Sequence, residues 1–110
     1  MDAVLHALSD EHRRTMLDEL SRGPASAGEL AALLPIARPG VSRHLRVLRE
    51  AGLVDVTQQA QFRVYTLAPE PLAEVDAWLG HYRGLWAQRL DALQTEITRG
   101  KKSQKARQRR

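Results

Sequence analysis

A long amphipathic segment near the end of the chain constrains the fold more than any other feature. Residues 70–98 begin beside Pro69 and Pro71 and contain only Gly80 and Gly84 as weak helix formers, which predicts one long helix. On a helical wheel, its apolar side chains fall within an arc of about 140° and form a stripe about 25 residues long. The stripe consists of Leu72, Val75, Trp78, Leu79, Tyr82, Leu85, Trp86, Leu90, Leu93 and Ile97.

A chain of 110 residues has too little remaining surface to cover such a stripe. We therefore predict that part of it is a contact between two subunits, to which a short first helix at residues 3–8 contributes. Ordinary core packing against the earlier helices is the alternative, and a small apolar ligand beside the two tryptophans is a weaker one. The predicted interface residues are Leu5, Leu72, Val75, Trp78, Leu79, Tyr82, Leu85, Trp86, Leu90 and Leu93.

Capping residues divide the first half of the chain into short helices. Asp10 is a suitable N-cap for a helix that stops near residues 23–24. Ser26, with Glu29 three residues later, forms a capping-box pattern that predicts a helix over residues 27–34. Pro39 suits a first helical turn, so a further helix is expected at residues 38–51, ending at Gly52.

Two segments after Gly52 are typical of β-strands. Residues 53–57 and 62–67 are rich in Val, Thr, Phe and Tyr. In the second segment, Phe62, Val64 and Thr66 occupy every second position, as in a strand with two different faces. The residues between them lack an Asn-Gly turn signature, so a hairpin is expected without a defined turn type. The order of elements predicts a mainly α fold with a two-stranded β-wing: a winged helix-turn-helix that dimerises through its terminal helices.

The helix at residues 38–51 has two chemically different faces. Val41, Leu45, Leu48 and Ala51 lie together on one side of the wheel, whereas the opposite side is basic. A helix with one face to bury and several guanidinium groups on the other suits insertion into the major groove of DNA. A solvated charged face paired with acids such as Glu50 is the alternative.

Arginine suits this role because its planar fork can bond a guanine edge or a phosphate through two hydrogen bonds. We predict that Arg38, Ser42 and Arg43 contact base edges, and that Arg46 and Arg49 contact phosphates. His12, Arg13 and Arg14 form a basic run that is expected to approach the DNA backbone, while His44 at the margin of the apolar arc is also expected to pack between helices. The predicted DNA-contacting residues are Arg38, Pro39, Ser42, Arg43, His44, Arg46, Arg49 and Arg63.

The runs at residues 5–14, 26–31 and 41–54, with the strand at residues 62–67, resemble the ArsR family of bacterial winged-helix repressors. The resemblance covers residues 3–98. It implies a homodimer on double-stranded DNA, with two recognition helices in successive major grooves of a palindromic operator. The chain departs from the family at Ala37, where a capping Ser is common, and Gly40 lies in the first turn. The glutamine-rich wing leaves Arg63 to reach a phosphate.

The net charge of +4 comes from the end of the chain. Residues 101–110 hold six basic residues and no acid, whereas residues 1–100 hold 11 basic and 13 acidic residues. We predict a DNA-binding and dimerisation domain at residues 1–99 and a basic, disordered tail at residues 100–110.

Several other functions lack support in the sequence. The chain has no cysteine, and Asp76 and His81 project about 140° apart on one helix, so no metal site or cofactor is expected. No catalytic constellation is present, and no apolar run is long enough for a membrane span. We predict a cytoplasmic transcription regulator that is not an enzyme, with no inducer identifiable. A winged-helix module for protein contact is the alternative function.

Overall fold

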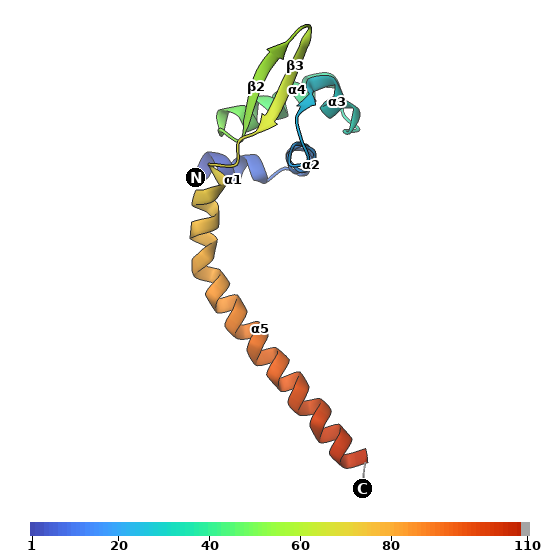
Figure 1. The fold of residues 1–110 in the computed structure, drawn as a ribbon, viewed down its shortest axis with the longest axis vertical. Helices are drawn as coiled ribbons and strands as arrows, with labels where there is room; N and C mark the ends of the chain where they lie inside the picture. Colours follow the sequence, from blue (N-terminus) through green and yellow to red (C-terminus); the bar gives the residue numbers. More distant parts are fainter. Residues whose placement is uncertain (109–110) are drawn as a thin grey trace. The chain divides into compact units, whose positions relative to one another are not determined.

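The computed structural model of the chain describes residues 1–108, with the side chains of residues 1–100. Residues up to Val75 form one compact unit, and the rest of the last helix belongs to a second. In chain order the elements are α1 (Asp2–Leu8), α2 (Glu11–Leu20), β1 (Ala25–Ser26), α3 (Ala27–Ala32), α4 (Arg38–Glu50), β2 (Val54–Gln59), β3 (Phe62–Leu67) and α5 (Leu72–Gln108). This arrangement, drawn in Figure 1, confirms the prediction of a mainly helical chain with a β-wing.

The two predicted helix caps in the first half of the chain are present. The Asp10 carboxylate accepts hydrogen bonds from the backbone N–H groups of His12, at 2.8 Å, and Arg13, at 3.1 Å. The Ser26 hydroxyl accepts from the N–H of Glu29, whose carboxylate accepts from the N–H of Ser26, each at 3.1 Å. These bonds satisfy N–H groups that have no partner within the helix, and so fix where α2 and α3 begin.

Helix α4 ends as the sequence predicts, at a glycine in the left-handed region. Gly52 has a φ of +77°, a conformation that glycine adopts with little strain because it has no Cβ. Its N–H donates to the carbonyl of Arg49, and the N–H of Leu53 donates to that of Leu48, both at 3.0 Å. This pair of bonds is a Schellman motif, and it turns the chain directly into β2.

The sheet contains one strand more than the sequence predicts. Its order is β1-β3-β2, with both pairs antiparallel, and Ala25 of β1 lies opposite Tyr65 of β3. A strand of two residues is too short to show an alternating pattern, and it exists here because β3 offers an edge for pairing. Strand β1 therefore joins the start of α3 to the wing (Figure 1).

The turn between β2 and β3 lacks the residues that usually mark a hairpin turn, so the sequence could not predict its type. Gln59 pairs with Phe62, so Ala60 and Gln61 form a two-residue connection. Ala60 has a φ of 55°, a conformation that glycine or asparagine adopts more easily. Nε2 of Gln58 donates to the Ala60 carbonyl at 3.0 Å, which gives the turn a local side-chain contact.

Helix α5 is longer than predicted. It runs to Gln108, ten residues beyond the expected end at residue 98. Lys, Gln, Ala and Arg after Gly100 are good helix formers, so a single glycine does not end the helix. The predicted helix end at residue 98 is therefore wrong. Residues 109 and 110 of the predicted tail lie outside the residues that the structure describes.

The core of the first unit joins the helices to the base of the wing. Its largest fully buried side chains are Met16 of α2, Leu30 of α3, Leu48 of α4, Val54 of β2 and Leu53 just before β2. Since α4 contacts α1, α2, α3 and β2, this core holds one face of α4 and leaves the other outside.

Candidate nucleic-acid interface

The two faces of α4 lie as the sequence predicts. Val41, Leu45 and Leu48 are 3%, 4% and 0% exposed. On the other side, the side chains assigned to DNA contact are exposed, with His44 the single exception on the helix. The exposed ones on α4 are Arg38, Pro39, Ser42, Arg43, Arg46 and Arg49, and Arg63 of β3 is exposed as well.

These arginines have no acidic partner within residues 1–100, where side chains are described. No ion pair there includes Arg38, Arg43, Arg46, Arg49 or Arg63. The alternative of a charged face neutralised by Glu50 is therefore not what the structure contains. An unneutralised row of guanidinium groups produces a positive potential, which attracts the phosphates of nucleic acids.

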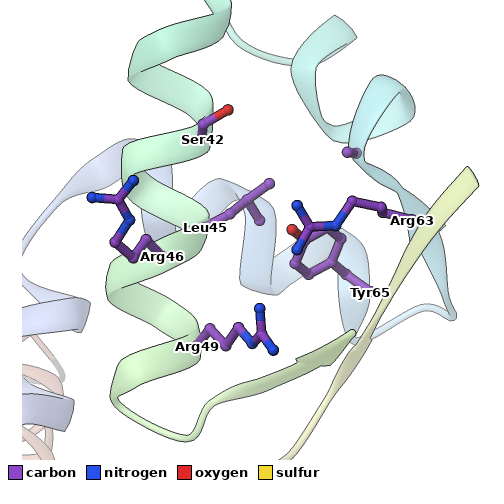
Figure 2. A pocket seen from close by; sticks show the side chains of 7 residues that line it. Ser42, Leu45, Arg46, Arg49, Arg63 and Tyr65 are labelled. Carbon is purple, nitrogen blue, oxygen red and sulfur yellow. The ribbon is translucent and has the colours of Figure 1, made fainter. Parts of the chain in front are cut away.

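A hollow of about 330 Å³ lies between α4 and the wing, and Figure 2 shows it from close by. Arg49 extends into it from α4, and Arg63 extends into it from β3 (Figure 2). No residue of the lining is acidic, so the hollow suits an anion. Its lining consists of Ala27, Ser42, Leu45, Arg46, Arg49, Arg63 and Tyr65.

Three lining residues were not among the predicted DNA contacts: Leu45, which was predicted on the buried face of its helix, Tyr65 and Ala27. Tyr65 is 5% exposed and shares the inner face of β3 with Arg63, while Ala27 comes from the first turn of α3. The alternation of β3 already places Arg63 and Tyr65 on one side of the strand, and this signal could have identified Tyr65. The meeting of Arg63 with Arg49 depends on the position of the wing, which no local pattern encodes.

His44 faces inward, away from the exposed arginines. Its side chain is 16% exposed, and its ring centroid lies 5.8 Å from that of His12 on α2. Its Nδ1 lies 3.2 Å from a guanidinium nitrogen of Arg13. The predicted packing between helices describes this position, and we leave His44 out of the contacts that we propose for DNA.

Arg13 also differs from its sequence-based prediction. It is 7% exposed, so it does not approach the DNA backbone with the rest of its basic run. Its guanidinium satisfies carbonyls at the end of α1. Sequence reasoning missed this role because a buried arginine and an exposed one have the same local signature.

The apolar stripe of α5 is exposed in the single chain. Trp78, Tyr82 and Trp86 are 42%, 49% and 64% exposed, and Leu85, Leu90 and Leu93 are more than half exposed. Trp78 and Tyr82 pack edge to face, with ring centroids 5.5 Å apart. Val75, by contrast, is 8% exposed and belongs to the core of the first unit, while Leu5, Leu72 and Leu79 are half-buried.

Helix α2 is followed by the short helix α3, by the basic, outward-facing helix α4 and by a β-hairpin. Together they define a winged helix-turn-helix DNA-binding protein. Residues 8–57 match the family described as "Helix-turn-helix domain".

Two curated relatives and one solved structure show the family. The chain is 46% identical over 72 residues to the HTH-type transcriptional regulator Rv2034 of Mycobacterium tuberculosis, covering 66% of this chain and 67% of that protein. It is 34% identical over 79 residues to the transcriptional repressor SdpR of Bacillus subtilis, covering 72% and 88%. The crystal structure of the ArsR family transcriptional regulator RHA00566 aligns with a TM-score of 0.71 at 35% identity, covering 78% and 89%.

The chain therefore belongs to the ArsR family of winged-helix transcription regulators, and it is a DNA-binding protein of that class. Among residues 1–108, no helix combines the length and apolarity needed to cross a membrane. Within the same residues, no three His, Asp or Glu side chains gather as they would around a metal ion.

Proposed function

We propose that this protein is a homodimeric repressor that acts in the cytoplasm by occupying a palindromic operator. The exposed basic face of α4, with no acidic partner among the described side chains, is the observation that carries the proposal. A protein bound over a promoter competes with RNA polymerase for the same DNA. Repression of this kind requires occupancy alone, so the protein needs no enzymatic activity.

The proposed contacts divide into two groups by their place on the helix. Arg38, Ser42 and Arg43 lie in the first half of α4, where a recognition helix reads base edges, and Pro39 is exposed in the same first turn. Arg46 and Arg49 lie in the second half and bind phosphates. Arg63 adds a phosphate contact from the wing, because it shares the hollow with Arg49.

The dimer forms through the apolar stripe of α5, to which Leu5 of α1 adds a contact. A run of exposed aromatic and leucine side chains is larger than a monomer normally leaves in water. Burying it against the same face of a second chain makes a two-fold interface. The two-fold symmetry of such a dimer matches a palindromic operator, whose two half-sites lie about 34 Å apart, one turn of DNA.

Selection from a random pool of DNA duplexes tests this function and identifies the operator in the same experiment. The full chain is incubated with the pool at about 150 mM salt, and bound duplexes are sequenced. We expect an inverted repeat with half-site centres about 10 base pairs apart and two chains per duplex by native mass spectrometry. Enrichment of no sequence, or one chain per duplex, would contradict the proposal.

The absent cap of α4 gives a stability prediction. Ala37 has the extended backbone of an N-cap residue, at φ −69° and ψ 153°, but no side-chain hydrogen bond. In Ala37→Ser, the hydroxyl can accept from the first turn, which should raise the free energy of unfolding by about 1 kcal/mol. Urea unfolding measures the change, and Ala87→Ser, within exposed α5, is the control. An equal midpoint for the Ala37→Ser variant and the unmodified protein would refute the cap argument.

The basic end of the chain gives a prediction about salt. Residues 101–110 carry six positive charges in sequence, and each phosphate that they neutralise adds about 0.9 to the slope of log affinity against log salt. Deleting these residues should weaken binding to every duplex to a similar degree and flatten that slope. Titrations at several salt concentrations, on a selected and an unrelated duplex, measure both effects. An unchanged slope would show that the tail does not contact DNA.

A further inference from the structure

A buried arginine connects three helices on the inner side of α4. Nε of Arg13, in α2, donates to the carbonyl oxygen of Ala7 at 2.7 Å, and one terminal nitrogen donates to that of His6 at 2.9 Å. The other terminal nitrogen lies 3.2 Å from Nδ1 of His44 in α4. One guanidinium therefore holds the last turn of α1 and the middle of α4 in a fixed relation to α2.

The chemistry of the Arg13–His44 contact determines which form of the imidazole can make it. A guanidinium has only hydrogen-bond donors, so Nδ1 of His44 must accept and cannot carry a proton. In the neutral ring the proton is then on Nε2, which lies 3.8 Å from Oδ1 of Asp10. That carboxylate oxygen already accepts from the backbone N–H groups of His12 and Arg13. Only neutral His44 can bond to Arg13 in this arrangement.

We propose that Arg13 and His44 position the recognition helix for specific DNA, and that protonation of His44 in acid breaks their contact and weakens specific binding. The inference rests on the DNA-binding function proposed above. His44 directly follows Arg43, which is exposed on the outer face of α4. A small rotation of α4 at this contact therefore moves the side chain that we assign to base edges, while the apolar core stays buried.

Burial and nearby positive charge favour the neutral form of His44 at neutral pH. The charged and titratable groups that face it are Asp10 at the N-cap of α2, His12 and Arg13 of α2, and Arg43 of α4 itself. Burial lowers the pKa of His44 below its ordinary value, the Asp10 carboxylate opposes this shift, and the positive charges of Arg13, His12 and Arg43 add to it. Burial raises the pKa of Asp10, but the hydrogen bonds from the backbone N–H groups of Arg13 and His12 and the positive charge of Arg13 outweigh this and lower it, so Asp10 stays ionised.

The direction in which DNA affinity changes in acid distinguishes loss of the Arg13–His44 contact from a general gain of positive charge. A proton on any histidine adds positive charge, which strengthens non-specific attraction to DNA. Protonation of His44 is expected to have the opposite effect on specific DNA. Stability changes as well: because the pKa of His44 is lower in the folded state, its contribution is complete above about pH 6.5 and declines as the pH falls from there towards the folded-state pKa.

The test measures affinity for a duplex selected by the unmodified protein, and for a scrambled duplex, between about pH 7.5 and about pH 5. We expect a loss of about tenfold on the selected duplex and no loss on the scrambled one. In His44→Asn, the amide oxygen can accept from Arg13 but cannot be protonated, so binding should no longer fall in acid. His81→Asn, on an exposed position of α5, is the matched control and should behave like the unmodified protein.

Titration of the histidine ring protons by NMR gives a second readout that does not depend on any variant. The midpoint of the loss of affinity should coincide with the titration of His44, below the ordinary range of histidine. An affinity for the selected duplex that is flat or rises in acid would overturn the proposal, as would the same acid loss in the His44→Asn variant. Failure to select any duplex at neutral pH would instead count against the proposed function itself.

Discussion

Reversing the charge of Arg43 is expected to reduce affinity for a selected duplex by more than about a hundredfold. Arg43 is exposed on the outer face of α4 and forms no ion pair within residues 1–100. Arg43→Glu removes a bidentate donor to a base edge and places a carboxylate beside the phosphates, so both the lost bond and the repulsion weaken binding. Fluorescence anisotropy with a labelled duplex measures the change.

The same charge reversal away from α4 distinguishes the loss of a local DNA contact from the effect of the changed net charge on affinity. Arg22 lies just after α2 and forms an exposed pair with Glu19 at 3.1 Å. Arg22→Glu changes the net charge by the same amount, so we expect it to lower affinity only through the general field, by less than about threefold. Similar affinities for the Arg43→Glu and Arg22→Glu proteins, both folded and dimeric, would favour a winged-helix module for protein contact instead.

The second large effect is expected at the apolar stripe of α5. Trp86 is 64% exposed in the single chain, and in the proposed dimer it is buried. Trp86→Glu would bury a carboxylate there, which costs more than the contact gains, so the protein should become monomeric at micromolar concentration. Loss of the second half-site contact should then reduce affinity for a palindromic duplex by more than about a hundredfold.

The expected monomer must also be a folded one. Of the stripe, only Val75 belongs to the core of the first unit, and Trp86 is not part of that core, so far-UV circular dichroism should change little in Trp86→Glu. Gln88→Glu adds the same charge on a part of α5 outside the stripe and should remain dimeric by analytical ultracentrifugation. A dimeric Trp86→Glu protein would show that the stripe is not the subunit contact.

The helices and the basic face could be predicted because their signals are local. Asp10, Ser26 with Glu29, and Gly52 act within one turn of the chain, and each fixes a helix end where the sequence places it. Strand β3 has the predicted bounds because this stretch is rich in Val, Thr, Phe and Tyr, with Phe62, Val64 and Thr66 at alternate positions. The opposed faces of α4 follow from a period of 3.6 residues, which a single helix displays in full.

Features that depend on contacts between distant segments could not be predicted. Strand β1 exists through its pairing with β3, and the left-handed Ala60 is held by the hairpin. The burial of Arg13 depends on carbonyls at the end of α1 and on His44, 31 residues further along the chain. A basic run in the sequence reads the same whether its arginine points to solvent or into a helix junction.

The most direct test of the account is the affinity of the unmodified protein for a selected duplex compared with a scrambled duplex of equal length and base composition. Anisotropy at about 50 and about 200 mM salt separates base readout from phosphate attraction. We predict that the ratio of the two affinities exceeds about a thousand and stays large at the higher salt, with two chains on each selected duplex. Equal affinities that fall together with salt would contradict specific DNA recognition by the helix Arg38–Glu50.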